Sequence, residues 1–561
     1  MASTKCDTKG LLRRRLPIVG WLPFYTWSKL LQDCLAGLTV GLTAIPQGIA
    51  YAIVAGLPAQ YGLYSGFMAL LVYVVLGGSK DITIGPTAIL ALMSQEHVTK
   101  LGEDGAVLLC FLMGSFILIL GLLHLGFLVD FISMPVTLGF TNAAAITIAA
   151  SQLKSLFGLS GSGNNIIDSL TLVFSNISKI SLWDTLLGLN FFFLLILEQT
   201  GNFWQKTRWV CCLARNAIVV ILATILAYVL YANNIKPFKL TGKIAEGLPP
   251  FGLPPFSITH NNQTYNFIES VEQLGTSVIS VPLIAVLENI AIAKAFAKGR
   301  SLDATQEMLA LGMGNIMGSF VRSMPTTGSF TRTAINNASE VQTQMGGVFT
   351  AALVLLACGL LTSTFEFIPK TALAAVIIVA MYYMLELGVI RILWRTKKID
   401  LVPFTATLVC CIFLSLEYGM IVGILVNMIL LLYSTARPGV LVKSEVVDGV
   451  QILVITPKQS LSYPAAEYLR QEVSMICSRC ESAGEILPVV LDGRHVHNID
   501  ATVAKNLKYL QGDLESRKQM LILWNWSAEV QETLEGFDDS LAKHFRTVST
   551  LNGIIIEGNL M

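Results

Sequence analysis

Apolar segments long enough to cross a membrane recur through most of this chain, and no other feature of the sequence constrains its fold as strongly. A helix needs about 20 predominantly apolar residues to span the hydrocarbon core of a bilayer. On this criterion the chain makes about fourteen crossings, counting two short ones. In order, the predicted segments are Leu35–Leu57, Tyr61–Leu76, Thr87–Met93, Ala106–Leu128, Pro135–Leu156, Leu182–Leu197, Ala217–Tyr231, Val278–Phe296, Met308–Val321, a short helix after Gly328, Val348–Leu361, Leu373–Met384, Leu401–Leu414 and Gly419–Tyr433.

The composition agrees with a polytopic α-helical membrane protein. Hydrophobic residues make up 53% of the chain and charged residues 13%, whereas about a quarter of the residues in a soluble protein are charged. The net charge is +1 and no basic tract is present, so we expect no nucleic-acid partner. A single C-x-x-C pattern at Cys477–Cys480 is too weak to indicate zinc. We also find no nucleophile–base set or phosphate loop, and therefore expect no catalytic residue, metal or cofactor.

The stretch Val321–Arg332, VRSMPTTGSFTR, lies within the apolar part of the sequence but does not have the pattern of an ordinary membrane helix. Pro325 and Gly328 interrupt the helical pattern, and five hydroxyl side chains surround them. A helix that resumes after Gly328 would present free backbone N–H groups and the positive end of its dipole, close to the guanidinium of Arg332. The stretch therefore predicts an anion site.

A second broken crossing, at Gly85–Ala88, makes a pair with this stretch. The two are the third and tenth of about fourteen crossings, so an odd number of spans in each half would place the second half upside down in the membrane. Interrupted helices at matching positions of inverted halves indicate a substrate site near the midplane of the bilayer. The alternative is that both are proline kinks that only help packing.

Basic residues predict the orientation, because they are enriched in cytoplasmic loops. With a cytoplasmic N-terminus, the basic clusters of several loops fall on the inner side. The sequons at Asn176 and Asn262 then lie outside and are candidate glycosylation sites. The clusters are Arg13–Arg15, then Lys206, Arg208 and Arg215, then Lys294, Lys298 and Arg300, then Arg391, Arg395, Lys397 and Lys398.

The character of the sequence changes near Arg437-Pro438. Strand-like runs (VQILVIT, ILPVVLDG, MLILWNW, GIIIEG) alternate with amphipathic stretches (YPAAEYLRQEVSMI, VAKNLKYLQGDL). Such alternation predicts a small α/β domain. We therefore expect a cytoplasmic N-terminal segment at 1–33, a transmembrane domain at 34–436 and a cytoplasmic domain at 437–561.

Several motifs resemble the sulfate permease family, solute carrier family 26, and the resemblance covers the whole chain. The signature-like stretch PAQYGLYS lies at Pro58–Ser65. The others are IPQGIAYA at Ile45–Ala52, IGPTA at Ile84–Ala88, Gln306-Glu307, and GSFTRT at Gly328–Thr333.

The resemblance implies a seven-plus-seven inverted repeat with a mobile core beside a gate domain, a homodimer, and a cytoplasmic domain of the sulfate-transporter-and-anti-sigma-antagonist (STAS) type. It also implies that the anion sits between the facing ends of the third and tenth helices. Carried over motif by motif, the substrate contacts are Gln47, Tyr51, Thr87, Ala88, Ser329, Phe330, Thr331 and Arg332.

A charge buried at this depth calls for a counter-charge, since an uncompensated arginine costs about 2.5–3.5 kcal/mol on insertion scales. Glu288 resembles a glutamate of the eighth span that proton-coupled members of the family carry. We hypothesise that Glu288 takes up a proton as a divalent anion enters. The alternative is a fixed structural ion pair between Glu288 and Arg332.

The leading interpretation is a sodium-independent secondary transporter of sulfate with an elevator-like mechanism. It would work by proton symport or by exchange for an anion such as chloride, bicarbonate or oxalate. The alternatives are an uncoupled chloride pathway and a non-transporting scaffold. Both termini are expected in the cytoplasm, and the membrane is expected to be the plasma membrane, the lysosomal membrane or both.

Overall fold

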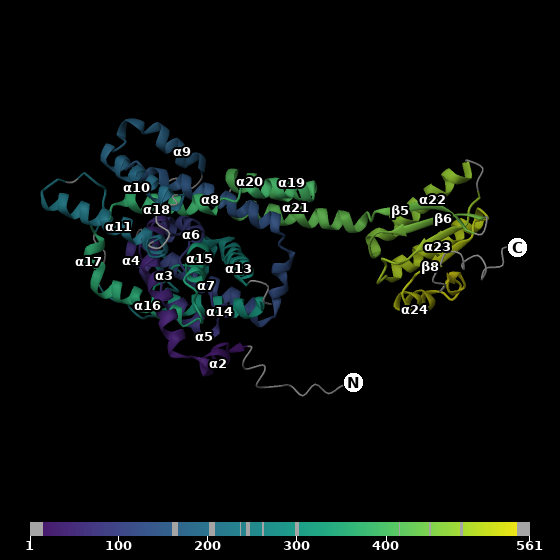
Figure 1. Ribbon diagram of the computed structural model, residues 1–561, viewed down its shortest axis with the longest axis horizontal. Coiled ribbons are helices and arrows are strands. Elements are labelled where there is room, and N and C mark those ends of the chain that lie inside the picture. The colour runs from purple at the N-terminus through teal and green to yellow at the C-terminus, as the bar shows by residue number, and fades with distance from the viewer. Residues whose placement is uncertain are drawn as a thin grey trace. The chain divides into compact units, whose positions relative to one another are not determined.

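The chain forms two compact units in the computed structural model, residues 1–424 and 425–561 (Figure 1). The described residues are 15–159, 166–200, 208–235, 237–242, 247–260, 263–297, 302–414, 416–447, 450–482 and 486–546. The predicted sequon at Asn262 and the strand-like run GIIIEG lie outside them. Asn176, the other sequon, follows helix α9 (Ile166–Ser175), and its Nδ2 donates to the Leu172 carbonyl at 3.0 Å.

The first unit is helical. Within the described residues, seven helical segments are long and apolar enough to cross a membrane, and four more apolar helices are shorter. The segments that correspond to the fourteen predicted crossings are, in order, α3 (Trp27–Val54), α4 (Ala59–Tyr64) with α5 (Met68–Leu76), β1 (Ile84–Gly85) with α6 (Ala88–Leu101), α7 (Glu103–Leu122), α8 (Met134–Leu156), α10 (Leu182–Thr200), α11 (Arg208–Ala232), α13 (Ser277–Phe296), α14 (Ala304–Ser319), β4 (Thr327–Gly328) with α15 (Phe330–Ala338), α16 (Gly346–Leu356) with a π-helical turn (Ala357–Leu361) and α17 (Thr362–Phe365), α18 (Lys370–Met384), α20 (Leu401–Phe413), and α21 (Leu416–Ala436).

Several helices, among them α3, α6 and α11, extend well beyond their predicted apolar segments. Helix α3 begins at Trp27 rather than Leu35, because the Thr26 hydroxyl caps it by accepting from the Lys29 N–H. Its early polar residue Asp33 is fully buried and accepts from the backbone N–H groups of Gln342 and Thr343. Helix α6 likewise continues past Met93 through a polar final turn.

The centre of the first unit is packed closely enough that small residues are required. Helices α7 and α14 touch through Gly114 and Gly312. A Cβ at Gly312 would lie 2.6 Å from the Leu118 backbone nitrogen, and one at Gly114 would lie 2.7 Å from the Ile316 nitrogen. Small residues at such contacts let membrane helices approach closely and gain van der Waals energy, which is the main attraction available in lipid.

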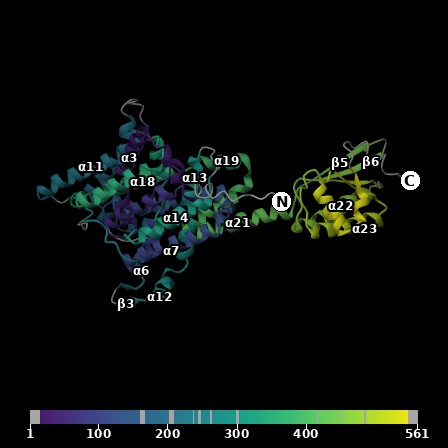
Figure 2. The same ribbon diagram turned by 90° about the horizontal axis from the view of Figure 1, so that it is seen from below.

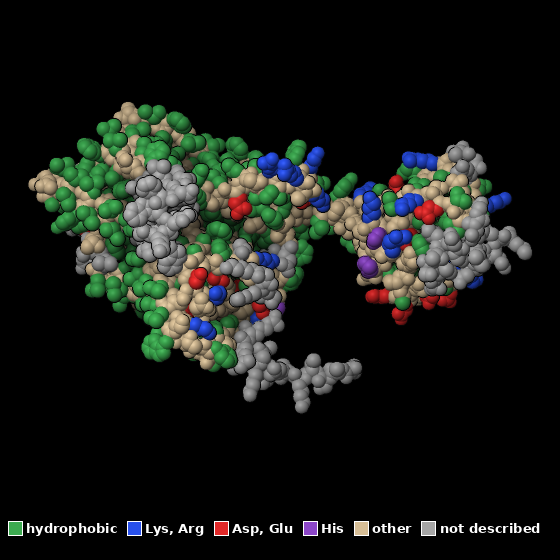
Figure 3. Space-filling model, viewed as in Figure 1, with side chains coloured by type: hydrophobic (Ala, Val, Ile, Leu, Met, Phe, Trp, Pro, Cys, Tyr) green, Lys and Arg blue, Asp and Glu red, His purple; other side chains and the backbone are tan. Residues whose placement is uncertain are grey.

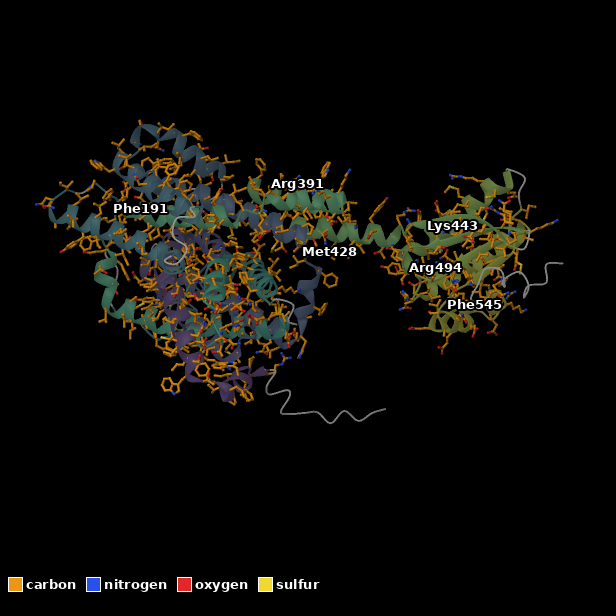
Figure 4. All side chains as sticks on the ribbon, viewed as in Figure 1. Phe191, Arg391, Met428, Lys443, Arg494 and Phe545 are labelled. Atoms are coloured by element: carbon orange, nitrogen blue, oxygen red, sulfur yellow. The ribbon has the colours of Figure 1, made fainter. Side chains whose placement is uncertain are left out.

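Hydrophobic side chains cover much of the face of the first unit that Figure 3 shows, as expected of a protein that faces lipid. Helix α19 (Gly388–Thr396) is an exception, because it is strongly amphipathic. It buries Val389 and Leu393 and exposes Arg391, which Figure 4 labels, and Arg395. A basic amphipathic helix of this kind suits the interface between lipid and water.

The second unit contains a five-stranded sheet in the order β5-β6-β7-β8-β9, in which only β5 and β6 pair antiparallel. Helices α22 and α23 pack against each other (Figure 2) and cover one face of the sheet. The α/β domain is thus confirmed. The elements are β5 (Val440–Val447), β6 (Val450–Pro457), α22 (Tyr463–Ser482), β7 (Val489–Asp492), α23 (Ala501–Ser516), β8 (Leu521–Trp524), α24 (Ala528–Phe537) and β9 (Phe545–Arg546).

Candidate functional site

The two broken crossings meet in a short antiparallel ladder. Strand β1 pairs with β4, with Ile84 opposite Gly328 and Gly85 opposite Thr327. The Ser329 N–H extends the ladder by donating to the Thr83 carbonyl at 3.1 Å. Backbone groups that would otherwise be unpaired deep in the membrane are therefore satisfied inside the protein.

Each strand of the ladder leads directly into a half-helix. Thr87 is the N-cap of α6, and its hydroxyl accepts from the Leu90 N–H at 3.4 Å. Ser329 is the N-cap of α15. Because the strands are antiparallel, the two helices leave the ladder in opposite directions and their N-termini lie next to each other. Two positive dipole ends with free N–H groups at one place favour an anion.

Arg332 lies in the first turn of α15, and its side chain connects this helix to the segment that leads into α6. Its side chain is 1% exposed, and its Nη2 donates to the Pro86 carbonyl at 2.7 Å. The guanidinium lies against Gly85, where an added Cβ would be 2.9 Å from Nη1. Its Nε is enclosed and has no acceptor among the described residues. The arginine thus keeps a donor and a full charge for a further group.

Glu288, on α13, lies beside this arrangement. Its Oε2 is 3.4 Å from the Thr87 hydroxyl, which is the donor of that hydrogen bond. Within the described residues no ion pair joins Glu288 to Arg332, so the fixed structural pair that we considered as an alternative is not formed in this structure. The carboxyl group is instead half-buried and faces a cavity.

That cavity has a volume of about 530 Å³ and lies between two groups of helices. On one side are α6, α13 and α15, and on the other are α8 and the end of α18. Glu288 and Phe330 both line it, so it extends to the first residue of α15. Phe330 is 39% exposed, and its ring lies 5.5 Å from that of Phe296.

The remaining predicted contacts surround the ladder. Gln47 and Tyr51 are one helical turn apart on α3, which contacts both α6 and α15. Both side chains are buried, and the Gln47 Oε1 accepts no hydrogen bond from the described residues. Tyr51 lies close enough to Arg332 and Glu288 to interact with both charges. Ala88 is buried at the first residue of α6, and the hydroxyls of Ser329 and Thr331 are 3.3 Å apart.

A buried network that the sequence did not reveal holds α13 in place. The fully buried carboxylate of Glu307 accepts from Asn289 Nδ2 at 3.1 Å, from the Tyr73 hydroxyl at 2.9 Å and from the Gly78 N–H at 3.0 Å. Asn289 is the neighbour of Glu288, so this network fixes the rotation of α13 that turns Glu288 toward the cavity. The available signal was a carboxylate directly before the predicted apolar segment Met308–Val321.

A second clamp, also missed, fixes the broken stretch itself. Asn315 on α14 accepts through its Oδ1 from both the N–H and the hydroxyl of Thr326, at 2.9 and 3.0 Å. Its Nδ2 donates to the Thr326 carbonyl at 2.9 Å. The unwound backbone before β4 is therefore held by side chains, which makes the site rigid before any ligand arrives.

Comparison with known proteins agrees with this geometry. The profile of the sulfate permease family matches residues 30–407, and that of the STAS domain matches residues 442–551. A Bos taurus protein named sodium-independent sulfate anion transporter is 42% identical over 560 residues, covering 97% of this chain and 91% of its own. Sulfate transporter 1.1 of Arabidopsis thaliana is 31% identical, covering 92% of this chain and 84% of its own.

A solved structure supports the fold. Murine solute carrier 26 family member A9, an anion transporter in the inward-facing state, aligns with a TM-score of 0.85 at 22% identity, covering 99% of this chain and 96% of the murine one. The resemblance seen in the motifs is thus confirmed along nearly the whole length. The chain belongs to the sulfate permease family, solute carrier family 26, a family of polytopic membrane transporters and not of enzymes.

Proposed function

We propose that this protein carries sulfate across a membrane and binds it at the β1–β4 ladder, between the N-termini of α6 and α15. One observation carries the proposal: the guanidinium of Arg332 is buried at the meeting point of two helix N-termini and has no carboxylate partner among the described residues. The fork of an arginine matches the spacing of oxygens on an oxyanion. The relatives named as sulfate transporters support this choice of anion.

We further propose an elevator-like movement, in which the helices that carry the ladder slide against α8 and α18. The cavity of about 530 Å³ between these two groups supports this division, because it separates them at the level of Glu288. Glu288 would accept a proton when a divalent anion enters, which keeps the moving group close to neutral. Exchange for chloride, bicarbonate or oxalate is the alternative form of coupling.

The setting of the protein is also part of the proposal. A cytoplasmic N-terminus, supported by the basic loops, would place Asn176 and Asn262 on the outer or luminal side as glycosylation sites. We propose a homodimer at the plasma membrane or the lysosomal membrane. An acidic lumen would supply protons for symport into the cytosol.

Uptake of radiolabelled sulfate by proteoliposomes tests the function. We expect uptake without sodium that is stimulated by an inward proton gradient. A chloride gradient imposed separately distinguishes symport from exchange. Chloride currents that continue without any sulfate flux would support the uncoupled pathway instead, and absence of any anion flux from folded protein would contradict transport.

Gly85→Ala tests the position of the arginine without changing a charge. The new methyl group would lie 2.9 Å from Nη1 and must displace the guanidinium. We expect sulfate uptake to fall about ten-fold, the equivalent of one weakened charge-assisted hydrogen bond. Gly388→Ala is the control, because nothing lies within 4 Å of its added Cβ. Equal uptake by both variants would show that sulfate transport does not depend on the position of the Arg332 guanidinium beside Gly85.

A further inference from the structure

The STAS domain contains a cavity that the transport site does not explain. It has a volume of about 450 Å³ and lies where the carboxyl ends of β7 and β8 meet. The loop after β7 contributes Arg494 and His497, the turn after β8 contributes Asn525, and the end of β9 contributes Arg546. The carboxyl edge of parallel strands is the usual place for a ligand in an α/β sheet.

The lining of this cavity is basic. The described residues that form it include two arginines and one histidine and no carboxylate side chain. The N-terminus of α24 opens onto it through Ser527, whose hydroxyl caps the helix by accepting from the Val530 N–H, and through Gln531. A helix N-terminus and two guanidinium groups that converge on one space all favour negative charge.

Contacts with Asp492 and Trp524 hold the Arg494 side chain in a fixed orientation. Its Nε donates to Oδ2 of Asp492 at 2.6 Å, and its guanidinium lies over the Trp524 ring at 5.7 Å. Asp492 is fully buried and also accepts from Thr456 and Asn525. Among the described residues nothing accepts from the two Nη atoms of Arg494. The Asp492 carboxylate thus binds the Nε of Arg494 and leaves the two Nη atoms of the guanidinium for a ligand.

Arg546 lies opposite Trp524 in the pairing of β8 with β9. Figure 4 labels its neighbour in the chain, Phe545. The Arg546 Nη1 donates to the carbonyls of Lys543 and Phe545 at 2.9 and 2.8 Å, which fixes the side chain. Its Nε is enclosed, and no described residue accepts from it. An enclosed donor without a partner is unfavourable, so an acceptor placed in the cavity would relieve a cost already present in the fold.

The aromatic residues of this region decide between a free oxyanion and a nucleotide. Trp526 is 5% exposed, donates from Nε1 to the Leu491 carbonyl at 2.9 Å, and packs on Gly493, where a Cβ would be 2.6 Å from the ring. The Trp524 ring is covered by Arg494. Neither indole offers an open face on which a base could stack, so the cavity fits a small anion better.

We propose that this cavity binds a free tetrahedral oxyanion, sulfate or phosphate, through Arg494, Arg546 and the N-terminus of α24. The full chain then holds two oxyanion sites, one at the ladder of the transmembrane unit and one in the STAS domain. The STAS site stands on its own contacts and does not depend on the proposed transport of sulfate.

Equilibrium binding of radiolabelled sulfate to the purified full-length protein tests the proposal. We expect Arg494→Gln with Arg546→Gln to weaken one class of site about ten-fold or more, the loss expected for charged hydrogen bonds. Arg332→Ala should remove the class of site at the ladder and leave the class in the STAS domain. Loss of one site can therefore be distinguished from loss of the other. Binding by the Arg332→Ala protein that is unaffected by the two further substitutions would overturn the proposal.

A second variant guards against misfolding. His497→Glu adds a negative charge to the cavity at an exposed lining side chain, so it should also abolish the STAS class of binding. Arg479→Gln is the control, because the exposed Arg479 donates to the Met475 sulfur and does not line the cavity. Free phosphate should compete with sulfate at this site. Displacement by ATP at concentrations far below those of free phosphate would overturn the assignment to a free oxyanion.

Discussion

We expect Arg332→Glu to abolish sulfate uptake by reconstituted protein and Arg332→Ala to lower it about 100-fold, the upper range for loss of a hydrogen bond to a charged group. The alanine variant removes the donor and the charge, and the glutamate variant also repels the anion. Folding should survive, because among the described residues the guanidinium donates only to the Pro86 carbonyl, and its burial is itself costly. Uptake of radiolabelled sulfate into proteoliposomes checks both variants.

Arg322→Gln is the matched control. Arg322 belongs to the same broken stretch, but it is ion-paired with Asp104 at 2.6 Å and its side chain is 41% exposed. We expect its uptake to stay within about two-fold of the unsubstituted protein, because half-exposed ion pairs contribute little. Normal uptake by Arg332→Glu, with a normal level of folded protein, would rule out the ladder as the substrate site.

We expect Glu288→Gln to make sulfate uptake independent of the pH on the side from which sulfate enters. In the unsubstituted protein, uptake should rise as that side becomes more acidic, since protonation of Glu288 offsets the second charge of the anion. Glutamine is permanently neutral, so the amide should mimic the protonated group and leave uptake flat. The measurement is the initial rate of uptake at a series of external pH values with the internal pH held constant.

Glu386→Gln provides the control for this pH series. Glu386 lines the same cavity from the end of α18, is exposed, and has its backbone N–H bonded to Asn142 Oδ1 at 3.0 Å. Its substitution should leave the pH dependence unchanged. If Glu288→Gln retains the full pH dependence while Glu386→Gln loses it, the proton is carried on the other wall of the cavity.

The sequence predicted the helices that form the site but not the backbone pairing that brings them together. Apolar length and the interruptions at Gly85–Ala88 and Val321–Arg332 placed both half-helices, because proline breaks the helical pattern and a charge inside an apolar segment usually serves a function. The pairing of Ile84 with Gly328 was not predictable, since a two-residue ladder leaves no periodic signal. The segment predicted from Thr87 and the helix predicted after Gly328 correspond to α6, which begins at Ala88, and to α15, which begins at Phe330.

The hydrogen-bond network around Glu307 could not be predicted from the sequence, for a different reason. Glu307 and Asn289 belong to different helices, and only packing brings them within 3.1 Å. The same holds in the second unit, where three strand-like runs and two amphipathic stretches predicted β6, β7, β8, α22 and α23. The short strand β9 and helix α24 carried too weak a pattern to be seen, although they form part of the basic cavity.

The central claim is that an oxyanion binds between the N-termini of α6 and α15, and anomalous diffraction from crystals grown with selenate tests it most directly. Selenate has the shape and charge of sulfate, and selenium identifies itself at its absorption edge. We predict an anomalous peak at the β1–β4 ladder within hydrogen-bonding distance of Arg332, which disappears in Arg332→Ala crystals. Selenate peaks elsewhere in the transmembrane unit, with none at the ladder, would contradict the account.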